Sequence, residues 1–147
     1  FINAKIFMGD SGSMILGFFA ALLTIYYLQA NERWEQPLLE HIDAMVFSFS
    51  VLIIPITDTI RVVFLRVFIL KKSPFSADRN HIHHALLDLG LNHIKATLLL
   101  VLVNIGFVVL TFYLNDYLRA KYLLIVIFLL AIGLSQIPFI LKKGRKS

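Results

Sequence analysis

Two long apolar runs without a single charged residue constrain this chain more than any other feature. They are Ala96–Leu114 and Tyr122–Leu141, of 19 and 20 residues. A helix needs about 20 consecutive apolar residues to cross the hydrocarbon core of a bilayer. The whole chain of 147 residues is 59% hydrophobic, well above the roughly 45–50% of soluble domains. A soluble domain of this size could not bury so much apolar surface, so lipid must be part of the solvent.

Two further apolar segments bring the number to four. Met14–Leu28 reaches spanning length if the flanking polar residues belong to its helix, whereas Ala44–Leu70 is too long for a simple crossing. We interpret Ala44–Ile56 as the membrane part, kinked at Pro55, with residues 58–70 leaving the bilayer as a continuing helix. The alternative is one long tilted helix whose arginines reach back to the interface.

The charges between these segments predict the orientation. Loop 29–43 has a net charge of −3, loop 71–95 has +2, and the C-terminal tail adds four basic residues. Four crossings put Lys5, loop 71–95 and the tail on one side. Cytoplasmic loops carry the excess of Lys and Arg, so we expect that side to face the cytoplasm. The net charge of +5 then favours anionic lipid or substrate as a partner, and no nucleic acid.

The expected fold is therefore an all-α, polytopic membrane helix bundle with about four transmembrane helices and a cytoplasmic histidine loop. It forms one domain over residues 1–147. The expected crossings, and the cytoplasmic helix and loop between the second and third, have these ranges: 12–30, 44–57, 96–114, 122–141 and 58–95.

The stretch FMGDSGS before the first crossing is the first polar constellation. Gly9 and Gly12 allow close approach of the backbone to a ligand, and Ser11 or Ser13 can cap the helix that follows. A helix N-terminus suits phosphate. Asp10 is costly at the rim of a bilayer unless it is paired, and Mg²⁺ bound by one carboxylate and phosphate oxygens is one resolution. A plain Asp/Ser helix cap is the other.

Three histidines within four positions, in HIHH, form the second constellation. If residues 80–88 form a short helix, His81 and His84 share a face at a spacing of three, and His83 points elsewhere. The pattern leaves four interpretations open: a zinc site, a pH sensor, an anion-binding surface of imidazole and guanidinium donors, and a solvated interfacial loop.

Other polar residues have structural interpretations. Asp58 and Arg61, three apart, are expected to neutralise each other where their helix leaves the membrane. Asn104, Ser135 and Gln136 lie within crossings, where hydrogen bonds between helices are expected rather than a transport path.

Taken together, the two constellations give the chain a resemblance to the polyprenyl-phosphate N-acetylhexosamine-1-phosphate transferase family. AKIFMGDSGSMILGF is similar to the family's magnesium-site segment, and PITDTIRV followed by SPFSADRNHIHHALLDLG resembles its later cytoplasmic loop. The HIHH form resembles the branch that starts O-antigen, enterobacterial common antigen or teichoic acid linkage, which includes the undecaprenyl-phosphate GlcNAc-1-phosphate transferases. The resemblance covers nearly the whole chain.

The resemblance implies a reaction at the bacterial inner membrane. The family transfers sugar 1-phosphate from a UDP-N-acetylhexosamine, with GlcNAc favoured, to undecaprenyl phosphate and releases UMP on the cytoplasmic face. Asp10 is then expected to ligate Mg²⁺, with Mn²⁺ as the alternative metal, and the surrounding Gly9, Ser11, Gly12 and Ser13 to bind substrate.

The resemblance also assigns roles in the later loop. The three histidines, His81, His83 and His84, are expected to contact the diphosphate of the nucleotide sugar or to support the loop. Arg79 is expected to pair with phosphate. Arg66, whose register is less certain, is expected to bind substrate.

The family's earlier aspartate-rich motif and its asparagine/aspartate loop do not occur in this sequence. We therefore expect a C-terminal fragment that needs the missing N-terminal half of the same protein and is inactive alone, while a homodimer is left open. The competing hypothesis is a small non-enzymatic membrane protein, such as a metal transporter using the histidine loop. A transporter should place polar ligands near the bilayer midplane, whereas the ionisable residues here lie at the rim.

Overall fold

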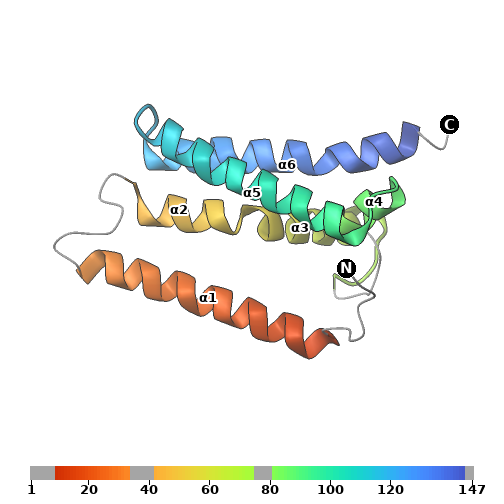
Figure 1. Ribbon diagram of the computed structural model, residues 1–147, viewed down its shortest axis with the longest axis horizontal. Helices are drawn as coiled ribbons and strands as arrows, with labels where there is room; N and C mark the ends of the chain where they lie inside the picture. The colour runs from red at the N-terminus through yellow and green to blue at the C-terminus, as the bar shows by residue number, and fades with distance from the viewer. Residues whose placement is uncertain (1–8, 34–41, 75–80, 145–147) are drawn as a thin grey trace. The chain divides into compact units, whose positions relative to one another are not determined.

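The computed structural model describes residues 9–33, 42–74 and 81–144, and of residues 9–14 and Leu16 it describes the backbone alone. Every regular element in these ranges is a helix, which confirms the all-α expectation. The chain divides into two compact units, Phe1–Glu40 and His41–Ser147 (Figure 1).

The described part of the first unit is one helix, α1 (Gly9–Arg33). The expectation that Ser11 or Ser13 caps this helix is wrong, because the helix already begins at Gly9 and both serines lie within it. Asp10 falls in the first turn, where a negative charge complements the partial positive charge of the helix N-terminus.

The second unit begins with a helix broken in two, α2 (Ala44–Val51) and α3 (Ile53–Phe64). The Asp43 carboxylate caps α2 by accepting from the backbone N–H groups of Met45 and Val46. The sequence had suggested a kink at Pro55, whereas the break between the two helices lies three residues earlier, at Leu52.

Pro55 causes this break from a distance of four residues. It has no N–H group to donate to the carbonyl four positions earlier, which is that of Val51. The side chain of Asn104 on the next long helix replaces the missing donor, with its Nδ2 atom 3.0 Å from the Val51 oxygen. The expected hydrogen bond between helices is therefore present at Asn104, whereas the Ser135 hydroxyl donates within its own helix, to the carbonyl of Ile132.

This substitution of donors predicts a coupling between two residues. Asn104→Leu should lower the free energy of unfolding in detergent micelles by about 1 kcal/mol, the usual contribution of one such hydrogen bond. In a Pro55→Ala background the same change should cost clearly less, because the introduced alanine supplies its own backbone N–H to the Val51 carbonyl. Equal costs in the two backgrounds, measured by denaturant titration, would show that Asn104 stabilises the fold in another way.

The end of α3 widens into a single π-turn, η1 (Leu65–Ile69), in which the Leu70 N–H reaches the Leu65 carbonyl five residues back at 2.9 Å. Arg66 is buried in this turn, and its Nη1 donates to the Pro74 carbonyl. Lys71 then takes a left-handed conformation with φ 51°, while the Lys72 N–H bonds the Arg66 carbonyl. The turn therefore anchors the start of the loop that leads to the histidines.

A short helix, α4 (Ile82–Asp88), carries two of the three clustered histidines. It ends in a Schellman motif, because the Leu91 N–H bonds the Leu86 carbonyl, the Gly90 N–H bonds that of Leu87, and Gly90 has φ 98°. Ile82 and Leu86 are buried and pack with Ala96. These contacts fix the histidine segment against the long helices.

The last two helices are α5 (His93–Asn115) and α6 (Ala120–Gly144), which form an antiparallel hairpin (Figure 1). Both are long and apolar enough to cross a membrane. They pack with α2 and α3 around one core, whose buried residues are Val46, Ile53, Phe107, Leu123, Ile127 and Ala131. Their bounds enclose the expected crossings 96–114 and 122–141.

Candidate active site

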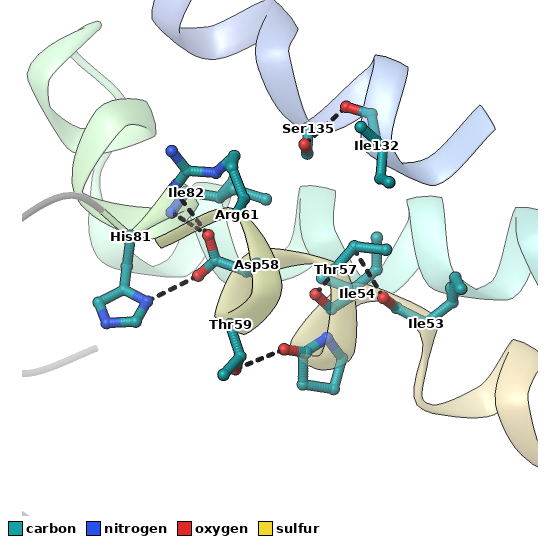
Figure 2. A network of polar contacts seen from close by, with 11 residues as sticks. Ile53, Ile54, Thr57, Asp58, Thr59, Arg61, His81, Ile82, Ile132 and Ser135 are labelled. Carbon is teal, nitrogen blue, oxygen red and sulfur yellow. Dashed lines mark hydrogen bonds and ion pairs between the residues drawn. The ribbon is translucent and has the colours of Figure 1, made fainter. Parts of the chain in front are cut away.

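Asp58, in the middle of α3, is the centre of a polar cluster (Figure 2). Its Oδ1 accepts from Nη2 of Arg61 at 2.9 Å and from the backbone N–H of Ile82 at 3.1 Å. Its Oδ2 lies 2.8 Å from Nδ1 of His81. The carboxylate thus joins α3 to the start of α4, 24 residues later.

Arg61 is the most enclosed member of this cluster. Its side chain is 9% exposed and that of Asp58 is 15% exposed. The guanidinium carbon also lies 4.0 Å from the centroid of the Phe139 ring on α6, a cation–π geometry. The expected ion pair between Asp58 and Arg61 is therefore present, and it additionally binds three helices together.

His81 stands immediately before α4 with an extended backbone, φ −76° and ψ 151°. Its carbonyl accepts from the N–H groups of His84 and Ala85, so its main chain is fixed on the side that leads into α4. The ring is 36% exposed. One ring nitrogen is therefore held inside the cluster, while part of the imidazole remains open to a ligand.

The three imidazoles lie in a row. The ring centroids of His81 and His83 are 6.0 Å apart and nearly parallel, and those of His83 and His84 are 4.0 Å apart. The expectation that His83 points away from the other two is wrong. The rule of three-residue spacing applies within a helix, and His81 lies outside α4, so its ring can meet that of His83.

This row affects the pKa of its middle member. The pKa of His83 is lowered from the ordinary 6.5, first because surrounding protein atoms displace part of its water, and then because His84 and His81 repel another positive charge. Asp58 opposes the shift, and His93 adds to it weakly. A neutral imidazole is therefore favoured at this position at neutral pH.

The lowered pKa of His83 gives a pH prediction with a definite sign. Below pH 6.5 the unfolded chain takes up this proton before the folded chain does, so the contribution of His83 to stability is lost as the pH falls. We expect His83 to titrate below 6.5 by NMR. His83→Asn should reduce the loss of unfolding free energy between pH 7.5 and pH 5.5. An unchanged pH dependence in that variant would contradict the assignment.

Among the predicted site residues, the histidines are brought together, and Arg66 is buried with its guanidinium donating to Pro74. Arg79 lies outside the described residues. The side chains of Asp10, Ser11 and Ser13 are outside the described ones as well, and only their helical backbone is known. Their roles stay predictions.

The cluster does not have the composition of a zinc site. Within residues 9–33, 42–74 and 81–144, no three His, Asp or Glu side chains come together in a way that could hold a metal ion. Asp58 uses its oxygens for nitrogen donors, and the imidazoles face one another. This arrangement suits an anion better than a transition metal.

Sequence reasoning missed the contact between Asp58 and His81, which are 23 residues apart. The spacing of three residues indicated the pair with Arg61, which uses Oδ1 of Asp58, and gave no signal for a partner of the other oxygen.

The cluster lies at the same end of the second unit as the basic C-terminal segment. Lys142 at the end of α6 forms an ion pair with Asp88 at the end of α4. Beside the cluster is an apolar cavity of about 280 Å³, lined by residues of α3 to α6 that include Ile54, Ile82, Leu100 and Pro138. The polar cluster and the apolar cavity therefore lie next to each other at one end of the helices.

The chain aligns with curated glycosyl-phosphate transferases. It is 35% identical over 108 residues to the probable undecaprenyl-phosphate N-acetylglucosaminyl 1-phosphate transferase of Bacillus subtilis, covering 73% of this chain and 27% of the relative. It is 33% identical over 105 residues to the decaprenyl-phosphate N-acetylglucosaminephosphotransferase of Mycolicibacterium smegmatis, covering 69% and 26%.

A longer alignment reaches 137 residues, at 28% identity, with the undecaprenyl-phosphate alpha-N-acetylglucosaminyl 1-phosphate transferase of Pasteurella multocida, covering 90% of this chain and 36% of the relative. No family model matches the chain. No solved structure matches it either. The chain thus spans about a quarter to a third of the length of the curated relatives it matches.

The apolar helices with a polar rim, together with these relatives, define a membrane protein. The chain belongs to the polyprenyl-phosphate N-acetylhexosamine-1-phosphate transferase family.

Proposed function

We propose that this chain is part of an enzyme that transfers N-acetylhexosamine 1-phosphate, with GlcNAc 1-phosphate favoured, from a UDP-sugar to undecaprenyl phosphate. UMP leaves, and the lipid-linked sugar begins a cell-envelope polysaccharide. The observation that carries the proposal is the alignment with relatives that are named for this transfer to a polyprenyl phosphate. The imidazole row beside Asp58 and Arg61 supplies a surface of the expected chemistry.

Two anionic substrates must meet at such a site. Transfer of a phosphoryl group depends chiefly on positioning and on electrostatic stabilisation. In our proposal His81, His83 and His84 contact the diphosphate, Arg79 pairs with phosphate, and Arg66 orders the loop that presents them. Part of the histidine set is neutral, so the row can donate hydrogen bonds to phosphate oxygens without collecting three positive charges.

Asp10 is our proposed ligand of Mg²⁺. One or two carboxylates are the donors that Mg²⁺ commonly takes together with substrate phosphates, and the N-terminal end of a helix suits phosphate as well. The metal would neutralise negative charge on the diphosphate. Residues outside this chain complete the site in our proposal.

The membrane arrangement is also part of the proposal. The helices α1, α2 with α3, α5 and α6 would make four crossings, with the basic ends and the histidine segment facing the cytoplasm of the inner membrane. The ion pair between Lys142 and Asp88 supports a common side for the tail and the histidine segment. The alternative of a metal transporter has no such support, since the described part of the chain holds no three-ligand metal group.

The test is an assay on the intact protein that contains this chain, in membranes supplied with undecaprenyl phosphate, Mg²⁺ and either UDP-GlcNAc or UDP-GalNAc. We expect UMP release together with a butanol-soluble labelled lipid, faster with UDP-GlcNAc, and no turnover by residues 1–147 alone. Absence of UMP with both nucleotides, in a correctly folded protein, would overturn the proposal. Turnover by residues 1–147 alone would overturn the claim that other residues complete the site.

A further inference from the structure

We propose that Asp58 is the positioning residue of His81: its carboxylate keeps a proton on Nδ1 and leaves Nε2 on the open side of the ring, where a proton on that nitrogen would let it donate to a phosphate oxygen. The effect on turnover rests on the function proposed above. The position of the proton on the ring does not rest on it, so the two can fail separately.

The geometry around the carboxylate supports this role. Oδ1 of Asp58 accepts from the Arg61 guanidinium and from the Ile82 N–H, at 2.9 and 3.1 Å. These two donors fix the plane of the carboxylate and leave Oδ2 for the imidazole, 2.8 Å from Nδ1. An ionised carboxylate only accepts hydrogen bonds, so Nδ1 of His81 must carry the hydrogen. In the neutral ring, Nε2 then has the free lone pair.

The exposed fractions of the two side chains also support the positioning role of Asp58. Asp58 is 15% exposed and His81 is 36% exposed, so the carboxylate lies behind the imidazole as seen from solvent. Ile82, whose N–H binds the same carboxylate, has a buried side chain in the core that holds α4. The peptide bond between His81 and Ile82 is thereby held in place, and the ring cannot turn without losing its bond to Asp58.

Carboxylates behind histidines have a general physical effect. A hydrogen bond to one ring nitrogen decides which nitrogen carries the proton and fixes the orientation of the ring. Around metal-binding histidines, loss of such an outer partner typically lowers metal affinity or activity about 10- to 100-fold, and we expect an effect of the same scale here. His83 and His84 contact the ring of His81 or of each other, whereas the imidazole that bonds Asp58 directly is that of His81, so the effect should be specific to His81.

Asp58→Asn is the decisive variant, because it preserves size and two of the three contacts. Its amide oxygen must still accept from Arg61 and Ile82, so the NH₂ group takes the place of Oδ2. Two donors would then face each other unless the proton of His81 moves to Nε2. In ¹⁵N-histidine NMR of the intact protein in detergent, with His81→Gln to assign the signal, we expect Nδ1–H in the parent and Nε2–H in Asp58→Asn.

The kinetic measurement separates positioning from stability. Asp58→Asn should lower kcat by about 10- to 100-fold and change KM for the UDP-sugar less than about threefold. In a His81→Gln background it should cost less than about twofold more, because both changes act through one ring. Asp88→Asn is the matched control, since Asp88 pairs with Lys142 on the same end of the helices, and it should leave the His81 signal and kcat unchanged.

Each outcome of these experiments bears on one claim. The same tautomer in parent and Asp58→Asn would overturn the proposal, whatever the enzyme turns over. Fully multiplicative losses in the double variant would overturn it too, and would assign Asp58 to the fold alone. If the parent releases no UMP, the proposed function fails, and the NMR result still decides the relation between Asp58 and His81.

Discussion

Asp10→Asn in the intact protein is expected to lower sugar-phosphate transfer by about a hundredfold or more, the scale of losing one electrostatic contact to the reacting charge. Asparagine keeps the shape of the first turn of α1 but removes the negative charge that we propose binds Mg²⁺. UMP release measures the loss. Binding of Mn²⁺, followed by electron paramagnetic resonance in the absence of turnover, should weaken in parallel.

A matched carboxylate serves as the control for Asp10. Asp116 lies at the end of α5, just before the turn to α6, and Asp116→Asn should retain activity and Mn²⁺ binding. A transporter or an assembly protein should tolerate Asp10→Asn. Unchanged activity together with unchanged metal binding would therefore show that Asp10 is not part of the site. The proposed Mg²⁺ site would then lose its main support.

Arg61→Met is expected to destabilise the second unit by about 3–5 kcal/mol, the usual cost of removing one partner of a buried ion pair. Asp58 would keep its charge in a site only 15% exposed, and the contact with the Phe139 ring would be lost. Methionine preserves most of the volume, so the loss reports charge rather than a cavity. Denaturant titration in mixed micelles, followed by circular dichroism, measures it.

The chain provides its own comparison for this ion pair. Lys142 and Asp88 are 34% and 51% exposed, and Lys142→Met should cost about 1 kcal/mol or less, as exposed pairs do. Combining Arg61→Met with Asp58→Leu should recover much of the loss, because no uncompensated charge remains. A cost for Arg61→Met as small as that for Lys142→Met would show that water screens the cluster more than its burial indicates.

Hydropathy alone predicted the two long helices well. The runs 96–114 and 122–141 lie within α5 and α6, because the bilayer requires a length of apolar sequence that is read directly. The break in the preceding segment was harder to place. Pro55 marks the missing donor, but the chain bends where the carbonyl loses its partner, and only the fold reveals that Asn104 replaces it.

The sequence predicted the histidines of the candidate site, whereas it indicated Asp58 and Arg61 only as an ion pair. The pairing of Asp58 with Arg61 follows from helical spacing, since three residues bring them to one face. The bond from Asp58 to His81 depends on how the chain returns after the π-turn, which local spacing does not encode. His83 was misplaced for a related reason, because His81 is not part of the helix whose geometry was assumed.

The π-turn η1 sets the direction in which the side chains at the end of this helix point. An α-helix advances about 100° per residue, so one additional residue in a single turn rotates the next side chains by about that angle relative to an uninterrupted helix. Arg66 reaches Pro74 from this shifted phase. Deleting one residue between Arg61 and Arg66 would therefore regularise the helix and at the same time turn the Arg66 side chain away from the Pro74 carbonyl. A regular α-helix at this point would therefore be incompatible with the contact that holds the start of the loop, and the additional residue of the π-turn makes that contact possible.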